Sequence, residues 1–213
     1  MTKITLGMIG AGLIGRKHLR KIDEHRDYDL VGIADVNVDA VAAAYPDTRV
    51  FAEYRQLLDE ARPEAVLIAT PNQLHAETGI ECARRGIHIL IEKPVTDTLE
   101  SAAALIAEVR KGGIKSLVGH HRRHHVPVKT LQKLLRDGGI GDIVGISAIW
   151  ATHKPADYFK VAPWRSQAGG GPILINLIHE IDFLRFTVGE IVPSRRSRRT
   201  GSAALRSRIR RQP

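Results

Sequence analysis

A glycine-rich turn near the N-terminus constrains the fold of this chain more than any other feature. The hexapeptide GAGLIG, residues 10–15, follows an apolar run at residues 4–9 and precedes an amphipathic stretch from about Leu13 to Glu24. Glycine permits a tight turn between a strand and a helix, and a third glycine lets the helix pack closely on the strand. The segment therefore predicts a strand, a turn and a helix in immediate succession.

The sequence that follows repeats this alternation of short apolar runs and longer amphipathic ones. Strands are expected at residues 30–34, 65–69, 87–91 and 116–119, and helices at residues 38–44, 53–60, 74–85 and 98–110. The apolar runs are continuous rather than alternating, which is typical of parallel strands buried on both faces. Strands that alternate with helices through short connections predict a doubly wound parallel α/β sheet.

The pattern changes near His120, where a second region begins. The expected elements of this region are a helix at residues 126–136, a long strand at 142–152 and, after the glycine run at 169–171, a helix at 175–186. Periodicity ends after Gly189. We therefore expect residues 193–213 to form a disordered tail rich in Arg and Ser.

The charge of the chain is concentrated in that tail. Residues 193–213 hold eight arginines and no acidic residue, and removing them lowers the formal net charge from +9 to +1. A nucleic-acid-binding domain usually spreads basic residues over a folded face. We therefore expect no nucleic-acid partner; the alternative, binding through the tail, predicts salt-sensitive binding that disappears without residues 193–213.

Several sequence features bear on the compartment. Cys82 is the only cysteine, so no intrachain disulfide is possible. No stretch approaches the ~20 apolar residues that a membrane-spanning helix needs. The N-terminal residues lack the layout of a secretory signal peptide. These features predict a cytoplasmic protein without a membrane partner.

The glycine turn also has the features of a dinucleotide site. Gly10 permits the turn, Gly12 lets the backbone approach a pyrophosphate, and Gly15 allows helix–strand packing. The helix N-terminus at Leu13 and Ile14 presents free N–H groups and a positive dipole end to phosphates. The alternative is a glycine-rich turn that binds nothing.

An acidic residue at the end of the second strand favours one of the two nicotinamide coenzymes. Asp35 lies 20 residues beyond Gly15. A carboxylate at this place accepts hydrogen bonds from the adenosine ribose hydroxyls and repels a 2′-phosphate. The sequence therefore predicts NAD as the cofactor, with NADP disfavoured.

Three further segments carry a family resemblance. They are ATPNQLH at residues 69–75, IEKPV at residues 91–95 and GGGPILINLIHEID at residues 169–182. In this order after the glycine motif they resemble the Gfo/Idh/MocA oxidoreductases, the relatives of glucose–fructose oxidoreductase and inositol dehydrogenase. The resemblance extends from residue 3 to about residue 192. It implies an NAD-binding Rossmann domain at residues 1–122 and an incomplete α/β C-terminal domain at residues 123–192.

The resemblance implies a reaction and two catalytic residues. Its members move a hydride between nicotinamide and a secondary alcohol of a sugar, polyol or cyclic diol, and they commonly form homo-oligomers. Oxidising an alcohol requires a general base and a polarising group near the oxygen. Lys93 is implied to hold the substrate oxygen. Glu92 and Lys93 are also implied to contact the cofactor. His179 is implied to accept the proton, and an imidazole with a pKa near 6.5 suits that role.

The segment around His179 departs from the commonest family pattern. Many members have Asp four residues before this histidine, where this chain has Ile175. Asn176, three residues before His179, shares its helix face and is expected to bind the substrate. Asp182 either orients the imidazole or pairs with a basic residue, and the sequence leaves both alternatives open.

The remaining expected contacts also follow from the resemblance. Thr70, Pro71, Asn72 and His75 are implied to lie along the nicotinamide half of the cofactor; alternatively, Asn72 caps the following helix. Residues Arg122 and Arg123 are expected to bind an anionic group of the substrate, and Trp164 and Arg165 are expected to line its pocket.

The histidine run at residues 120–125 suggests a metal site only superficially. Metal ligands usually come from separated positions that can converge on the ion, whereas consecutive residues point in different directions. We expect no metal.

The tail has three interpretations, which are a nucleic-acid-binding arm, a native disordered arm and the product of a changed reading frame. We favour the third, because family members continue well beyond this point and the tail has the composition of an out-of-frame GC-rich gene. A shortened second domain makes oligomerisation of this chain doubtful. The alternative function is therefore a non-catalytic dinucleotide-binding protein or an inactive truncated remnant.

Overall fold

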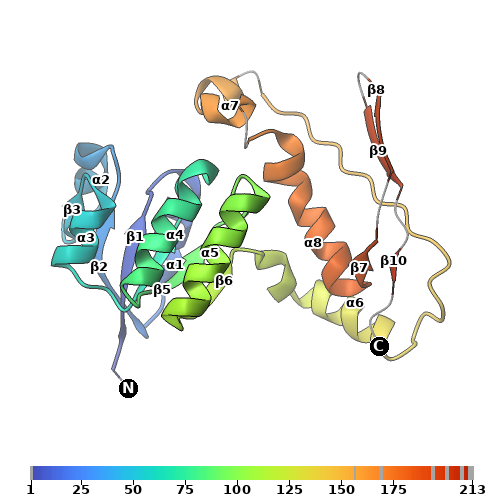
Figure 1. Cartoon of the computed structure of the whole chain (residues 1–213), viewed down its shortest axis with the longest axis horizontal. Coiled ribbons are helices and arrows are strands. Elements are labelled where there is room, and N and C mark those ends of the chain that lie inside the picture. The colour runs from blue at the N-terminus through green and yellow to red at the C-terminus, as the bar shows by residue number, and fades with distance from the viewer. Residues whose placement is uncertain are drawn as a thin grey trace. The chain divides into compact units, whose positions relative to one another are not determined.

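The structure is a computed structural model that describes residues 2–155, 157–167 and 170–192, together with the backbone of residues 195–199, 202–206 and 209–210. The chain divides into two compact units (Figure 1). Unit 1 comprises Met1–Gly119 and Phe159–Gly171, and unit 2 comprises His120–Tyr158 and Pro172–Pro213.

Unit 1 is built on a six-stranded, fully parallel sheet with the strand order β3-β2-β1-β4-β5-β6. Its strands are β1 (Ile4–Ile9), β2 (Tyr28–Ala34), β3 (Val50–Phe51), β4 (Ala65–Ile68), β5 (His88–Ile91) and β6 (Ser116–Val118). The chain moves outward from β1 to β3 and then returns to the other side of β1 at β4. The strand order thus reverses between β1 and β4, and this is where ligands bind in open α/β sheets.

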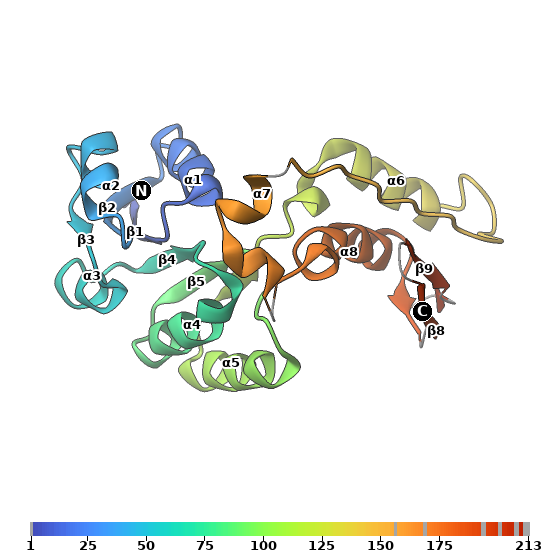
Figure 2. The same ribbon diagram turned by 90° about the horizontal axis from the view of Figure 1, so that it is seen from above.

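Helices cover both faces of this sheet. They are α1 (Leu13–Asp23), α2 (Val38–Ala44), α3 (Tyr54–Glu60), α4 (His75–Arg84) and α5 (Leu99–Gly112), with a short 3-10 helix, η1 (Asn72–Leu74), before α4. Figure 2 shows α1 and α2 over one face and α4 and α5 over the other. The predicted doubly wound α/β fold is confirmed.

Local sequence explains where the longest of these helices begins and ends. The Thr98 side chain accepts a hydrogen bond from the Ser101 amide, and the Ser101 hydroxyl accepts one from the Thr98 amide, which forms a capping box before α5. Gly113 ends the helix in the left-handed conformation, with φ of 64°. Between these ends, Leu105 points into the core.

The core of unit 1 lies between the sheet and its helices. Leu57, Ile68, Ile91 and Leu105 are almost completely buried on one side, and a second cluster around Met8 packs on the other. Cys82 lies in the first cluster at 0% exposure. Burial raises the pKa of its thiol to about 12.

Unit 2 is mainly helical in its described part. Its elements are η2 (His121–His124), α6 (Val126–Arg136), the π-helix η4 (Ile173–Leu177), α8 (Ile178–Thr187), and the strands β7 (Glu190–Ile191), β8 (Arg195–Arg199), β9 (Ser202–Arg206) and β10 (Ile209–Arg210). Strand β10 pairs with β7 and β9 with β8, both antiparallel. Two short helices of the connecting segment are α7 (Asp157–Lys160) and η3 (Pro163–Ser166). The amide of Gln132 on α6 donates to the Phe186 carbonyl of α8 at 2.9 Å.

One expected element of unit 2 is wrong. Residues 142–152 form no strand, although their sequence has a strand pattern. A strand needs a neighbour for its backbone hydrogen bonds, and none of the strands that the structure describes pairs with this segment. Val144 is 100% exposed and Ile149 is 89% exposed, so the apolar positions are uncovered as well.

The tail is described only in part. Its backbone forms the short strands β8, β9 and β10, where the composition predicts irregular structure. Residues 193–194, 200–201, 207–208 and 211–213 lie outside the described residues. The expectation of a disordered tail stays a prediction.

A groove of about 590 Å³ runs along the sheet of unit 1 beside α1. Its lining is largely apolar and includes Ile4, Leu6, Ile22, Leu90 and Leu117. The four strand residues among them, Ile4, Leu6, Leu90 and Leu117, lie before the carboxyl ends of their strands, so the groove is separate from the predicted dinucleotide site. Among the described residues, no helix has the length and apolar character needed to cross a membrane.

Candidate dinucleotide and catalytic site

The three motif glycines have the three different surroundings that a phosphate-binding turn requires. Gly10 has φ of 91°, and a Cβ there would lie 2.8 Å from the Ala69 carbonyl carbon, so only glycine fits. A Cβ on Gly15 would overlap the Gly10 carbonyl oxygen and lie 2.8 Å from Met8 Cε. A Cβ on Gly12 would meet nothing within 4 Å. The turn is therefore packed at its two ends and open in its middle.

The open glycine lies where α1 begins. Gly12 is the N-cap of α1, and no side chain caps this end. Leu13 is 70% exposed and Ile14 is 40% exposed. The first N–H groups and the positive dipole end of this eleven-residue helix thus lie at an end that no side chain caps, as anion binding requires.

Asp35 lies beside the turn at the carboxyl end of β2. Its Oδ2 accepts a hydrogen bond from the Ala11 amide at 2.6 Å, and its Oδ1 accepts one from the Asn37 amide at 2.9 Å. A carboxylate has about four acceptor positions. Asp35 therefore orders the glycine turn and retains acceptor positions for sugar hydroxyls.

The loop after β4 lies against the same turn. The Thr70 amide would be 2.9 Å from a Cβ on Gly10. The hydroxyl oxygen of Thr70 is buried and has no hydrogen-bond partner among the described residues. Pro71 is half-buried and precedes η1. An unsatisfied buried hydroxyl at this place is suited to a ligand hydrogen bond.

Asn72 and His75, which follow Pro71 in the chain, are both buried. Asn72 is 3% exposed and belongs to η1. The N-cap of α4 is Leu74, whose side chain makes no capping hydrogen bond. The predicted roles of Asn72, as a cofactor contact or as a helix cap, stay predictions. His75 is 1% exposed, and both of its ring nitrogens lie 2.9 Å from backbone carbonyl oxygens, those of Pro94 and Thr70. Both ring nitrogens thus contact the protein backbone, and the expected contact of His75 with a cofactor ribose stays a prediction.

The segment after β5 is held from the side of α1. Glu92 Oε1 lies 2.7 Å from His18 Nε2, and Glu92 Oε2 accepts a hydrogen bond from the Lys93 amide at 3.1 Å. Burial raises the pKa of Glu92, but the hydrogen bond and charge of His18 and the Lys93 amide outweigh it, so that the pKa is lowered overall. Lys93 is half-buried and is followed by a cis peptide bond to Pro94.

Sequence reasoning did not find two residues that support Glu92. His18 lies on an amphipathic helix, where nothing in the sequence distinguishes it from a surface histidine. Gly119 follows β6, and a Cβ there would lie 3.0 Å from the Glu92 carboxyl group. Both contacts join residues far apart in the chain, so only the fold reveals them.

In unit 2, the predicted proton acceptor follows an irregular helical turn. Asn176 lies in the π-helix η4, and His179 lies in the first turn of α8. The Nδ2 atom of Asn176 is buried and has no hydrogen-bond partner among the described residues. The His179 ring is 5.1 Å from the His121 ring, centroid to centroid, in an edge-on contact. Single π-turns inside helices are frequent at functional sites.

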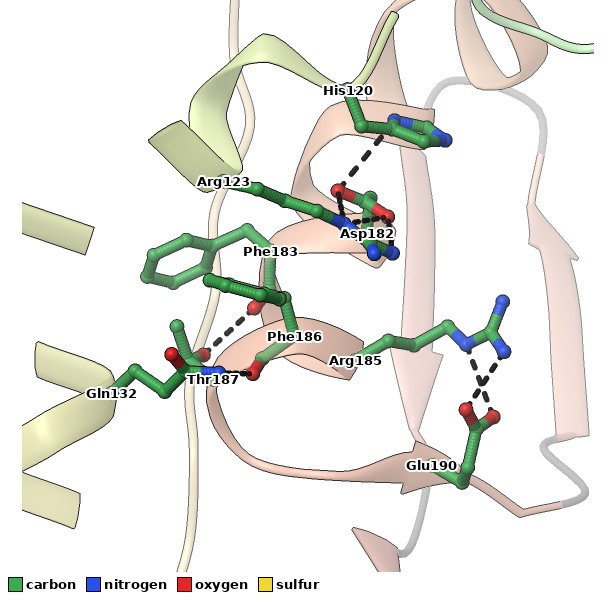
Figure 3. Close-up of polar contacts among 9 residues, drawn as sticks. All are labelled: His120, Arg123, Gln132, Asp182, Phe183, Arg185, Phe186, Thr187 and Glu190. Atoms are coloured by element: carbon green, nitrogen blue, oxygen red, sulfur yellow. Dashed lines mark hydrogen bonds and ion pairs between the residues drawn. The ribbon is translucent and has the colours of Figure 1, made fainter. Parts of the chain in front are cut away.

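Asp182 pairs with a basic residue, the second of the two alternatives. Two of the three nitrogens of the Arg123 side chain, Nε and Nη2, donate to its carboxylate at 3.0 Å and 2.5 Å, and His120 Nδ1 lies 3.5 Å away (Figure 3). Asp182 is 5% exposed. The Asp182 hydrogen bond raises the pKa of Arg123, although burial opposes this. The pair therefore fixes η2 to α8.

The other residues predicted to bind a substrate also have partners within the chain. Arg122 bonds Glu180 of α8. The guanidinium of Arg165 stacks over the Trp164 ring at 5.7 Å, within η3 of unit 1. Within the described ranges, no group of three or more His, Cys, Asp or Glu side chains is arranged to hold a metal ion.

The predicted site residues are shared between the two units. All residues predicted to contact the cofactor belong to unit 1, as do Trp164 and Arg165. His179, Asn176, Arg122 and Arg123 belong to unit 2.

Comparison with known families gives this arrangement a context. The model of the oxidoreductase family with the NAD-binding Rossmann fold, GFO/IDH/MocA, matches residues 4–120, and the GFO/IDH/MocA C-terminal domain matches residues 128–200. The first match covers more than half of the chain, which therefore belongs to the GFO/IDH/MocA oxidoreductase family. The second match continues past Val192, where the sequence resemblance was expected to end.

Individual relatives agree with this assignment. The rhizopine catabolism protein MocA of Rhizobium meliloti is 30% identical over 89% of this chain and 59% of its own length. The inositol 2-dehydrogenase of the same species is 31% identical over 88% of this chain and 56% of its own length. The chain thus spans less than two thirds of these relatives.

A solved structure resembles the whole described architecture. The WlbA dehydrogenase from Bordetella pertussis, in complex with NADH and UDP-GlcNAcA, has a TM-score of 0.86 and 28% identity. The similarity covers 97% of this chain and 64% of that chain.

The residues present in unit 1 fit a nicotinamide dinucleotide. The space beside Gly12 is open and lies at the N-terminus of α1. A side chain at this position would occupy that space and keep a ligand away from the backbone. The unsatisfied Thr70 hydroxyl and the Asp35 carboxylate lie on the two sides of the glycine turn. The backbone at Gly12 would hold the pyrophosphate, and the Asp35 carboxylate would hold the adenosine ribose. The Thr70 hydroxyl would contact the nicotinamide nucleotide.

Proposed function

We propose that this chain is an NAD-dependent oxidoreductase that transfers a hydride between nicotinamide and a secondary alcohol of a sugar, polyol or cyclic diol. The observation that carries the proposal is the arrangement at the strand-order reversal, where open Gly12, the Asp35 carboxylate and the Thr70 hydroxyl adjoin one turn. Family membership and the names of the dehydrogenase relatives support the reaction type.

Two residues of this chain would handle the substrate hydroxyl. Lys93, beyond the carboxyl end of β5, holds and polarises the alcohol oxygen through its ammonium group. His179 accepts the hydroxyl proton at an imidazole nitrogen. Bound NAD supplies the hydride-accepting carbon of the nicotinamide ring. The unsatisfied Asn176 amide donates a hydrogen bond to an oxygen of the substrate.

NAD is the preferred coenzyme in this proposal. The Asp35 carboxylate accepts from ribose hydroxyls and repels a 2′-phosphate. The next residue, Val36, is 94% exposed and carries no charge that could pair with a phosphate. Arg122, Arg123, Trp164 and Arg165 are proposed to contribute to a substrate pocket, in addition to the contacts they make within the chain.

The names of the relatives support a polar, small-molecule substrate. They include enzymes of inositol and anhydro-sugar metabolism, and the WlbA structure holds a sugar nucleotide. We further propose a cytoplasmic location and, for an intact member of the family, a homo-oligomer.

The first test is a calorimetric titration of the chain with NAD and NADP, alongside Asp35→Ala. We expect micromolar NAD binding, much weaker NADP binding and loss of NAD binding in the variant. Asp39→Ala, which removes an acidic residue from the exposed surface of α2, serves as the matched control. A folded chain that binds neither nucleotide would contradict the cofactor proposal.

One observation favours a second candidate, a dinucleotide-binding protein without catalytic activity. Ile175, at the position where many family members have Asp, is 6% exposed and apolar. Assaying NAD reduction with a panel of polyols, sugars and cyclic diols separates the two functions. NAD binding without turnover of any panel member, also after Ile175→Asp, would favour the second.

A further inference from the structure

A buried histidine links the two loops on the nicotinamide side of the sheet. His75 is the first residue of α4 and is 1% exposed. Its Nδ1 lies 2.9 Å from the Pro94 carbonyl oxygen, and its Nε2 lies 2.9 Å from the Thr70 carbonyl oxygen. The ring thus bridges backbone groups that are more than twenty residues apart.

The two carbonyl groups belong to the segments that follow neighbouring parallel strands. Thr70 lies two residues beyond the end of β4, and Pro94 comes directly after Lys93, beyond the end of β5. Because the carboxyl ends of parallel strands meet at one edge, both segments border the ligand crevice. Asp35, which marks the adenosine half, lies on the other side of β1.

The same contacts continue to the phosphate-binding turn. A Cβ on Gly10 would lie 2.9 Å from the Thr70 amide, so the turn and the Thr70 loop are in direct contact. A continuous line of contacts therefore runs from Gly10 through Thr70 and His75 to Pro94. Lys93 is bonded to the last residue of that line.

We propose that His75 is a positioning residue, which fixes the backbone of Lys93 relative to the loop that borders the nicotinamide half of the dinucleotide. This rests on the function proposed above. It gives His75 a role in the site that requires no contact with the cofactor.

The chemistry of imidazole makes the two contacts unequal. Burial lowers the pKa of His75, although its carbonyl contacts oppose this, so the neutral ring is favoured. A neutral imidazole has one N–H group and donates to one carbonyl oxygen only. The proposed role assigns this N–H group to Nδ1, which then donates to the oxygen of Pro94, the residue bonded to Lys93.

Two substitutions separate the two contacts. An Asn side chain at position 75 places an amide N–H close to the position of Nδ1, and a Gln side chain places one close to the position of Nε2. Thus His75→Asn retains a donor for Pro94, and His75→Gln retains a donor for Thr70. His75→Leu introduces an apolar side chain and retains neither donor.

The test compares NADH with ADP-ribose, which lacks the nicotinamide ring. Dissociation constants of both ligands are measured by calorimetry for the wild-type chain and the three variants, together with thermal unfolding. We expect ADP-ribose to bind all four proteins equally, because Asp35 and the glycine turn are unchanged. We expect the preference for NADH over ADP-ribose to fall about tenfold in His75→Leu and His75→Gln, and to be retained in His75→Asn.

The possible outcomes distinguish this proposal from the one on which it rests. A wild-type chain that binds neither ligand overturns both. A wild-type preference for NADH that survives in all three variants, or equal losses in His75→Asn and His75→Gln, overturns the role of His75 alone. Parallel losses of ADP-ribose binding and thermal stability would instead show a general structural role, and would also overturn it. If His75→Leu does not fold, the comparison of Asn with Gln decides.

Discussion

Gly12 and Gly15 lie one helical turn apart, but the space available to a side chain differs between the two positions. An added Cβ at Gly15 would overlap the Gly10 carbonyl oxygen, whereas one at Gly12 would enter open space. The conformation of Gly12, with φ of −66°, is also accessible to alanine. The need for glycine is therefore structural at one position and related to the ligand at the other.

Alanine substitutions at these two positions are expected to have separate effects. Gly15→Ala should lower the free energy of unfolding by about 1–3 kcal/mol, because the turn must move to admit the methyl group. Gly12→Ala should change it by less than about 0.5 kcal/mol, yet it should abolish NADH binding, because the methyl group occupies the pyrophosphate's approach. Urea denaturation and NADH titration check both. Normal NADH affinity in a folded Gly12→Ala variant would refute the assignment.

Glu92 gives the stability of unit 1 a pH dependence of known sign. Its pKa is lowered in the folded chain, so its contribution is complete above the ordinary carboxyl pKa of about 4.3 and is lost as the pH falls through the folded value. The difference in unfolding free energy between wild type and Glu92→Gln should therefore be largest at neutral pH and shrink on acidification. Urea denaturation across that range measures it.

The control for this experiment removes a different carboxylate, at the end of α1. Glu24 lies at the C-terminal end of that helix, where it bonds the exposed Lys21 side chain at 2.5 Å. If Glu24→Gln produced the same pH-dependent difference as Glu92→Gln, the effect would belong to net charge and not to the His18–Glu92 contact.

At the scale of elements, two arginines of one short helix make unequal contributions to packing. Arg123 forms its two-nitrogen contact with Asp182, whose side chain is 6% exposed, whereas Arg122 and Glu180 are 34% and 26% exposed. Removing a partner from a buried carboxylate leaves it desolvated, and exposed pairs contribute little. The attachment of η2 to α8 therefore depends mainly on Arg123.

Alanine at each of these positions tests that inequality. Arg123→Ala should destabilise the chain by about 1–3 kcal/mol, and Arg122→Ala by less than about 1 kcal/mol. Adding Asp182→Asn to Arg123→Ala should restore part of the loss, because the buried charge is gone. Chemical denaturation followed by circular dichroism gives the three values. Equal losses in the two single variants would mean that burial of Asp182 is unimportant.

The elements of unit 1 could be predicted because each one carries its own pattern. Continuous apolar runs mark β1, β4 and β5, and amphipathic stretches mark the helices between them. The strand pattern at residues 142–152 was misleading, because strand formation depends on a neighbour that sequence periodicity does not describe. The π-turn at Ile173–Leu177 has no sequence signal either, since its side-chain spacing resembles that of an ordinary helix.

The site residues likewise divide into those that a local sequence pattern marks and those that depend on contacts with distant segments. The Gly12 turn and Asp35 were predictable, because local motifs and a fixed spacing define them. The contacts of His18, His75 and Gly119 were not, because they join segments 19 or more residues apart across the sheet edge. A buried histidine and a ligand-binding histidine look alike in a single sequence.

At the scale of the whole molecule, the chain separates coenzyme recognition from the predicted proton acceptor. Every residue predicted to contact NAD belongs to unit 1, and His179 belongs to unit 2. Binding of the dinucleotide can therefore be measured as a property of unit 1 within the intact chain. The proposed catalytic residues Lys93 and His179, in contrast, belong to different units.

The burial of Cys82 has a practical consequence for following that first unit in solution. The thiol is fully covered and its pKa is raised to about 12, so it supplies little reactive thiolate while the core is closed. Since it is the only cysteine of the chain, a maleimide dye would attach at one known place, and only during openings of the core. The labelling rate thus measures how often the Rossmann core opens, and no cysteine needs to be introduced for this purpose.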